Sequence, residues 1–159
     1  MVRTFTYARA VAPMLWVMVG LSSVELVVVH GLLAFWRPWI AAAASLVTGG
    51  SVLWLIAMIR SFPNLPVIVG PDGVTMRVGR FRAAQVAAAN VAGLRGGWSA
   101  ETLKQRDVLN MALIAYPNVV LELREPQRIG RRTVRAVAHR LDDPAGFAEA
   151  IEALGQRHD

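Results

Sequence analysis

The stretch AVAPMLWVMVGLSSVELVVVHGLLAFWRPWIAAAASLVTGGSVLWLIAMI, residues 10–59, decides the fold of this chain. Its only charged residues are Glu25 and Arg37. Residues 10–36 would extend about 40 Å as an α-helix, and residues 39–59 match the thickness of a bilayer's hydrocarbon core. Soluble core helices rarely stay apolar on every face over such lengths. We therefore predict a two-helix transmembrane hairpin within residues 1–61.

The flanking residues predict how this hairpin is oriented. Its first apolar run is about twice the length of a signal-peptide core, and no small-residue cleavage site follows it, so we expect an anchor. Arg3 and Arg9 precede the first span, Arg37 alone lies between the spans, and Arg60 follows the second. The positive-inside rule then places both termini in the cytoplasm. Residues expected at the membrane interfaces are Trp36 and Trp39 outside and Tyr7 inside.

Glu25 is the unusual residue of the first span, because it lies near the expected bilayer centre, where an ionised carboxylate is costly. Folding the hairpin about its turn brings Glu25 opposite Gly50, and His30 opposite Ser45. Small residues let helices approach closely, and hydroxyl groups can hydrogen-bond a carboxyl group. The expected intramembrane polar contact comprises Glu25, His30, Ser45, Thr48, Gly49, Gly50 and Ser51.

Three interpretations of Glu25 stay open. It could be an uncharged packing contact across the hairpin or to another subunit. It could belong to a proton or ion relay with His30, although the two residues are about 140° apart around a helix and do not share a face. It could also contact a larger membrane protein.

Residues 62–159 have the composition of a soluble domain, and the prolines of RSFPNLP mark the boundary. PVIVGPDGVTMRVGRF predicts a β-hairpin, because β-branched runs flank a Pro-Asp-Gly turn. Residues 118–123 and the segment TVRAVAHRL predict further strands, joined by a loop EPQRIGRR. The alanine-rich residues 83–97 fit either a helix or a strand, and residues 101–116 fit either a helix or an extended loop.

The last segment, LDDPAGFAEAIEAL, predicts an amphipathic helix. Asp142 or Asp143 can cap it, with Pro144 at or near its first position. Its apolar stripe is Phe147, Ile151 and Leu154. Strands followed by one such helix predict an α+β domain, or a partly open β-barrel closed by the helix.

Three segments of this domain, residues 66–77, PNVVLELREP at 117–126 and LDDPAGFAEAI at 141–151, resemble bacterial pleckstrin-homology-like domains. Many of those domains follow a pair of transmembrane helices, which is the order found here. The resemblance implies a PH-like sheet domain at the cytoplasmic membrane face. It carries over no catalytic or phosphoinositide-binding residue, and the segment RDVLNMALIAY, residues 106–116, is longer than a minimal strand connection.

The chain is basic, with a net charge of +6, but it shows no aromatic-interleaved basic stripe, so we expect no nucleic acid partner. For a membrane-tethered chain, anionic lipid explains the excess of arginine more simply. The candidate lipid or partner contact is an arginine-rich loop region comprising Arg124, Arg128, Arg131, Arg132 and Arg135. The alternative is that these arginines are simply solvated.

The sequence contains no expected catalytic, cofactor or metal site. There is no cysteine, and the histidines, His30, His139 and His158, have no metal-ligand spacing. We therefore expect a non-enzymatic adaptor or accessory protein of the bacterial cytoplasmic (inner) membrane. Its expected partners are membrane lipids and another membrane protein or a second copy, with no small-molecule substrate identified. The alternative is a small subunit of a transport or proton-handling complex that uses Glu25.

Overall fold

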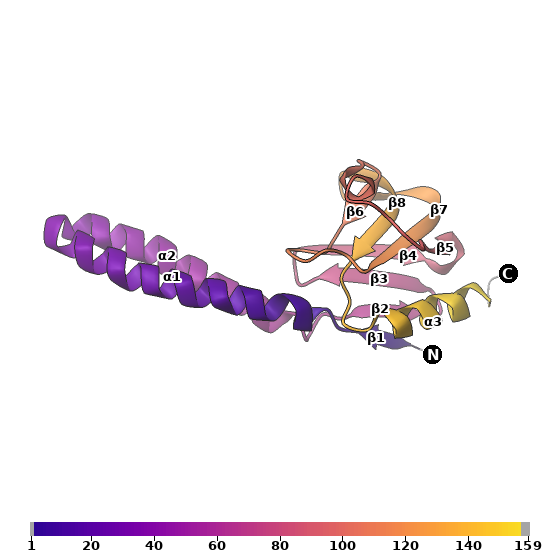
Figure 1. The fold of residues 1–159 in the computed structure, drawn as a ribbon, viewed down its shortest axis with the longest axis horizontal. Coiled ribbons are helices and arrows are strands. Elements are labelled where there is room, and N and C mark those ends of the chain that lie inside the picture. Colours follow the sequence, from indigo (N-terminus) through magenta and orange to yellow (C-terminus); the bar gives the residue numbers. More distant parts are fainter. Residues whose placement is uncertain (1, 157–159) are drawn as a thin grey trace. The chain divides into compact units, whose positions relative to one another are not determined.

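A computed structural model describes residues 2–156 and divides the chain into two compact units. Residues 12–61 form one unit, which holds most of the helical hairpin, and the described residues 2–11 and 62–156 belong to the other, the sheet unit. Figure 1 shows the two helices of the hairpin, and separately the strands and terminal helix of the sheet unit. His158 lies outside the described residues.

The hairpin consists of α1 (Ala8–Trp36) and α2 (Pro38–Ser61), separated by Arg37. Both helices are long and apolar enough to cross a membrane. They do not resemble the core helices of a soluble protein, because most of their large apolar side chains are exposed: Leu21 is 69% exposed and Leu46 78%. Helix boundaries agree with the predicted spans to within a few residues.

The sheet unit has the predicted α+β composition, built from two four-stranded sheets and a terminal helix. The first sheet is antiparallel, in the order β1 (Arg3–Phe5), β2 (Val67–Gly70), β3 (Gly73–Val78) and β4 (Arg82–Ala87). The second has the order β5 (Val91–Leu94), β7 (Val119–Ile129), β8 (Arg132–His139) and β6 (Val108–Asn110). Only β6 and β8 pair in parallel. Two short 3₁₀ helices, η1 (Ala88–Asn90) and η2 (Thr102–Lys104), and α3 (Pro144–Gly155) complete the unit.

Strand β1 is the main difference from the expected division at residue 61. Arg3, Thr4 and Phe5 pair with Val69, Ile68 and Val67 of β2. The hairpin is therefore inserted between two neighbouring strands of one sheet, and the first 11 residues belong to the sheet unit.

Tertiary pairing also decides the two segments that the sequence left ambiguous. The alanine-rich residues form β4 and β5, because each pairs with a strand of its sheet. Residues 101–116 contain only η2 and the three-residue β6. The loop expected over EPQRIGRR is instead mostly the second half of β7. Pro126 lies within a register irregularity of this strand, between Glu122 and Gln127.

Helix α3 forms as its sequence predicts. The carboxylate of Asp143 accepts a hydrogen bond from the Gly146 N–H at 2.9 Å, and Pro144 occupies the first helical position. The predicted stripe is buried, with Phe147 fully inaccessible. The Phe147 ring meets the ring of Phe5 edge-on, with 5.3 Å between centroids. Helix α3 therefore contacts β1 through Phe5, and it packs against β2 of the first sheet and β5 of the second.

Replacing Phe147 with Ala should destabilise the sheet unit by about 3–5 kcal/mol, because the ring is fully buried. Unfolding of the full chain in micelles can be followed by the fluorescence of Trp98, in a chain whose four helix tryptophans are changed to Phe. Trp98 reports on the core because it packs against Val108, Val120, Ala136 and Ala138. The control is Phe81→Ala, which removes a half-exposed ring and should cost less than about 1 kcal/mol. Equal losses in the two variants would contradict the assigned packing of α3.

Candidate functional site

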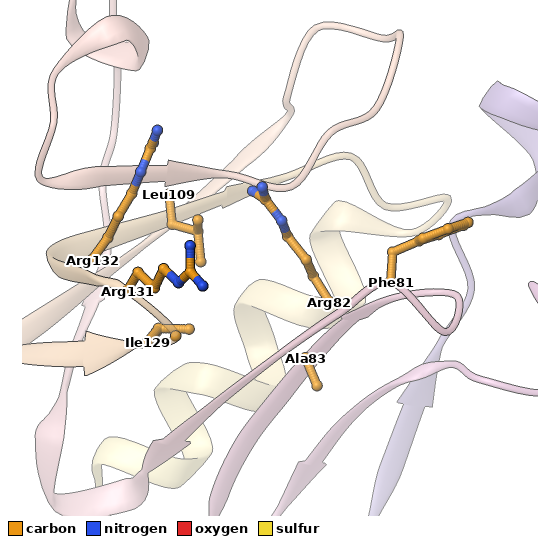
Figure 2. A pocket seen from close by; sticks show the side chains of 8 residues that line it. Phe81, Arg82, Ala83, Leu109, Ile129, Arg131 and Arg132 are labelled. Carbon is orange, nitrogen blue, oxygen red and sulfur yellow. The ribbon is translucent and has the colours of Figure 1, made fainter.

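An arginine-lined cavity of about 430 Å³ lies between the β3–β4 turn, the β7–β8 turn and β6. Figure 2 shows the side chains of Arg82, Arg131 and Arg132 around it, with Leu109 between Arg132 and Arg82 and Ile129 below Arg131. None of its lining residues is acidic. A larger depression of about 590 Å³ has Asp72 as its only charged lining residue. The arginine-lined cavity is therefore the stronger candidate for a charged ligand.

Two tight turns bring these arginines to the cavity. Val78 pairs with Arg82 across the first turn, whose Gly79 has a positive φ of 49°. Ile129 pairs with Arg132 across the second, where Gly130 takes a φ of 62°. Glycine adopts this left-handed conformation without the steric cost that a Cβ would add. The arginines thus lie at the ends of paired strands.

The cavity combines cationic walls with an apolar floor. Leu109 is buried, whereas Arg82, Arg131 and Arg132 are exposed, so their guanidinium groups remain solvated and accessible. Guanidinium groups bind phosphate and carboxylate oxygens in a planar, two-pronged geometry. The arrangement can bind an anionic group, and it contains no paired nucleophile and base among its lining residues.

The five arginines of the predicted contact do not act as one group. Arg131 and Arg132 line the cavity, whereas Arg124, Arg128 and Arg135 are absent from its lining. Arg124 donates from Nε to the Val91 carbonyl at 3.1 Å. The sequence analysis missed Arg82, because nothing local shows that the β3–β4 turn meets the β7–β8 turn.

The expected intramembrane contact is present in part. The His30 Nδ1 lies 2.6 Å from the Ser45 Oγ, at the register that the short turn predicts. Glu25 and Thr48 line the same small cavity, of about 40 Å³, between the two helices. Within residues 2–156, however, Glu25 makes no hydrogen bond, so its carboxyl group has no partner in this part of the chain.

Gly50 and Ser51 differ from the expectation. A Cβ added at Gly49 would meet the Leu26 side chain at 4.0 Å, whereas one added at Gly50 would meet nothing within 4 Å. The Ser51 Oγ donates to the Val47 carbonyl of its own helix. The helical period explains the difference, because residues three and four apart share a face: Ser45, Thr48 and Gly49 face α1 together, and Gly50 turns away.

A second polar group, Tyr7, is buried at the end of the sheet unit where the chain leaves for the hairpin. Tyr7 is 2% exposed, and its hydroxyl donates to the Leu65 carbonyl at 3.2 Å and accepts from the Gly79 N–H at 2.7 Å. Its ring packs against Phe62 and His139. Burial raises the pKa of this phenol, and the Gly79 N–H partly offsets that effect. The expected interfacial role of Tyr7 is therefore replaced by a structural one.

His139 is the buried titratable neighbour of Tyr7. Its Nε2 lies 2.8 Å from the Arg77 carbonyl, and its Nδ1 lies 3.0 Å from the Arg140 carbonyl. Burial lowers the pKa of the imidazole below its ordinary 6.5, against the opposing effect of these two carbonyls. A neutral imidazole can donate to only one of these two carbonyls.

Comparison with models of protein families, with curated proteins and with solved structures gives no match for this chain.

Gly49→Leu should separate the two hairpin helices, because the added side chain would extend towards Leu26. Gly50→Leu is the matched control and should have no such effect. The measurement is the oxidation yield of a cysteine pair at Val29 and Ala44, which line the same small cavity. We expect the yield to fall several-fold only with Gly49→Leu. An equal fall with Gly50→Leu would contradict the assigned helix faces.

The free energy of unfolding should decrease as the pH falls below 6.5, the ordinary value for histidine. Because the native pKa of His139 is lowered, the unfolded chain binds more protons in this range, and stability rises with pH. His139→Gln should flatten this dependence between about pH 7 and about pH 5. Denaturant titrations monitored by Trp98 fluorescence would measure the slopes. If the free energy of unfolding of His139→Gln changed with pH as steeply as that of the wild type, groups other than His139 would cause the pH dependence.

Proposed function

We propose that this chain is a non-enzymatic, membrane-anchored adaptor or accessory protein of the bacterial cytoplasmic membrane. In this proposal the hairpin spans the membrane, and the sheet unit is a PH-like domain at its cytoplasmic face. The arginine-lined cavity is the surface offered to an anionic group of a lipid or protein.

The pairing of β1 with β2 is the observation that carries this proposal. These strands precede and follow the hairpin in sequence, yet they lie side by side in one sheet. Both ends of the hairpin must therefore lie on the same side of any membrane that it crosses. The two inserted helices are apolar and exposed, and only Arg37 separates them at the distal turn. Such a hairpin is typical of a membrane anchor, here for the sheet unit.

Charge supports the cytoplasmic side for that unit. Arg9 and Arg60 lie at the two ends of the hairpin that connect to the sheet unit, and Arg37 alone lies at the distal turn. Basic residues near short loops favour the cytoplasmic side of a bacterial membrane. The PH-like assignment is supported by two four-stranded sheets followed by a terminal helix, together with the sequence resemblance.

Glu25 supports a second membrane partner. Its side chain is exposed on the helix surface and has no hydrogen-bond partner within residues 2–156. A carboxyl group in hydrocarbon is costly without a partner, so we expect another membrane protein or a second copy to meet it. The same observation favours the alternative function, a small subunit of a transport or proton-handling complex.

The topology can be tested with single cysteines, because the natural chain has none. An impermeant maleimide should label Arg37→Cys in intact bacterial cells, and should label Ala89→Cys only after lysis. Ala89 lies on the sheet unit and is exposed. Labelling of Ala89→Cys from outside would reverse the orientation and overturn the cytoplasmic adaptor.

The adaptor and the transport subunit differ in which residues their association needs. Chemical cross-linking in native membranes, followed by affinity purification, would compare the wild type with two variants. For the adaptor, the combined change of Arg82, Arg131 and Arg132 to Gln should abolish the cross-linked partner or lipid, and Glu25→Gln should retain it. The reverse pattern would favour the transport subunit.

A further inference from the structure

The long connection between β6 and β7 presents apolar side chains to solvent at its tip. Leu113, Ile114 and Tyr116 are 46%, 46% and 53% exposed. Sequence analysis singled out this segment only for its length. Single exposed apolar residues are normal on a protein surface and need no explanation. A contiguous exposed apolar group is typical of an interaction site.

The base of this loop is well anchored, so that the tip is held in place. Met111 and Ala112 are buried, and their N–H groups donate to the Ala138 carbonyl at 2.8 Å and to Asn110 Oδ1 at 2.9 Å. At the other end, Asn118 exchanges two hydrogen bonds of 2.8 Å with the backbone of Leu141.

These anchors place the loop at the end of the sheet unit that connects to the hairpin. Leu141 is followed by Asp142, whose N–H donates to the Thr6 carbonyl at 2.9 Å. His139, two residues earlier, packs on Tyr7, whose hydroxyl reaches Leu65. The loop base therefore lies beside both chain segments, residues 6–7 and 62–65, that lead directly into the hairpin.

Chain continuity keeps this end close to the membrane. Tyr7 lies four positions before the start of the first span at Val11, which limits the distance between them to about 14 Å even when the chain is fully extended. Leu65 is as close in sequence to the end of the second span at Ser61. Whatever the tilt of the sheet unit, its connecting end must lie near the bilayer surface if the hairpin spans.

The charges around the loop suit the surface of an anionic bilayer. Arg140 donates from Nη1 to the Tyr116 carbonyl at 3.2 Å, which brings a guanidinium group beside the apolar tip. Arg80, next to Gly79, is exposed near Tyr7. The two neighbouring carboxylates are both engaged, since Asp142 accepts from the Arg9 N–H and Asp143 caps α3. Apolar and tyrosine side chains beside arginines match the composition of interfacial membrane contacts.

We propose that Leu113, Ile114 and Tyr116 insert into the headgroup region of the membrane that the hairpin spans. This inference rests on the proposed function, since it needs the hairpin to be in the bilayer. It makes the loop a second attachment, which fixes the orientation of the sheet unit. Phe81 and Arg82 of the arginine-lined cavity lie two and three residues after Gly79, so one end of the cavity then faces the lipid headgroups.

The test uses the full chain in nanodiscs of phosphatidylethanolamine and phosphatidylglycerol, with the fluorophore NBD on single cysteines. Ile114→Cys and Leu113→Cys report the loop. Ala89→Cys is the matched control, because it is exposed on η1, which follows β4 at the opposite end from the β3–β4 turn. Leu46→Cys, on the exposed surface of α2, reports insertion of the hairpin itself.

We expect NBD at 114 and 113 to be quenched by lipids with a doxyl group near the headgroup, and to be protected from iodide several-fold relative to position 89. Equal quenching by iodide at 114, 113 and 89 would overturn the inference. Protection from iodide without quenching by lipid would instead assign the loop to a second copy, and would also overturn it. Loss of deep lipid quenching at Leu46→Cys would overturn the membrane span, and with it the proposed function, independently of the loop.

Discussion

The three backbone pairs between Arg3–Phe5 and Val67–Val69 are the constraint on which the arrangement of this chain depends. They place the residues before the hairpin and those after it in one sheet. The edge-on contact of Phe5 with Phe147, and the 3.7 Å ion pair between Arg3 and Glu149, hold the same strand to α3. The buried contact carries most of this stabilisation, because the ion pair is exposed to solvent. Both ends of the hairpin therefore lead into the same sheet.

Polar groups at the connecting end reinforce this constraint. The Tyr7 hydroxyl joins the backbone of Leu65, just after the hairpin, to that of Gly79 in the β3–β4 turn. His139 adds a contact from the second sheet, through the Tyr7 ring and the Arg77 carbonyl. Buried polar groups cost free energy unless they are hydrogen-bonded, so a partly satisfied set would destabilise this end. Both chain connections and both sheets meet in one small hydrogen-bonded cluster.

The same cluster brings two candidate surfaces together at the end of the sheet unit from which the chain continues into the hairpin. Gly79 leads into Phe81 and Arg82, and Leu141 orients the loop that carries Leu113 and Tyr116. Cationic and apolar side chains therefore both lie at this end, as in the contact of Arg140 with the Tyr116 backbone. A membrane surface presents the complementary arrangement, with anionic headgroups above hydrocarbon. In the proposed function, the anchor and the ligand cavity are parts of one membrane-facing surface.

The sequence by itself determined the elements whose signals are local. Uniform apolar composition defined α1 and α2, the Pro-Asp-Gly turn defined β2 and β3, and the capped stripe defined α3. The short turn at Arg37 also set the register that brings His30 to Ser45. Each of these follows from composition, turn chemistry or helical period within one contiguous segment.

Only the tertiary structure decided the features that need partners distant in sequence. Arg3–Phe5 is too short to show a strand pattern, and it becomes a strand only because β2 offers an edge. The alanine-rich residues of β4 fit either a helix or a strand locally, and pairing with β3 decides for the strand. Arg82 and Arg131 are 49 positions apart, and no local pattern could place them in one cavity. The different surroundings of Gly49 and Gly50 were likewise decided by packing. In the packed hairpin Gly49 faces Leu26 of α1, and Gly50 faces away from it.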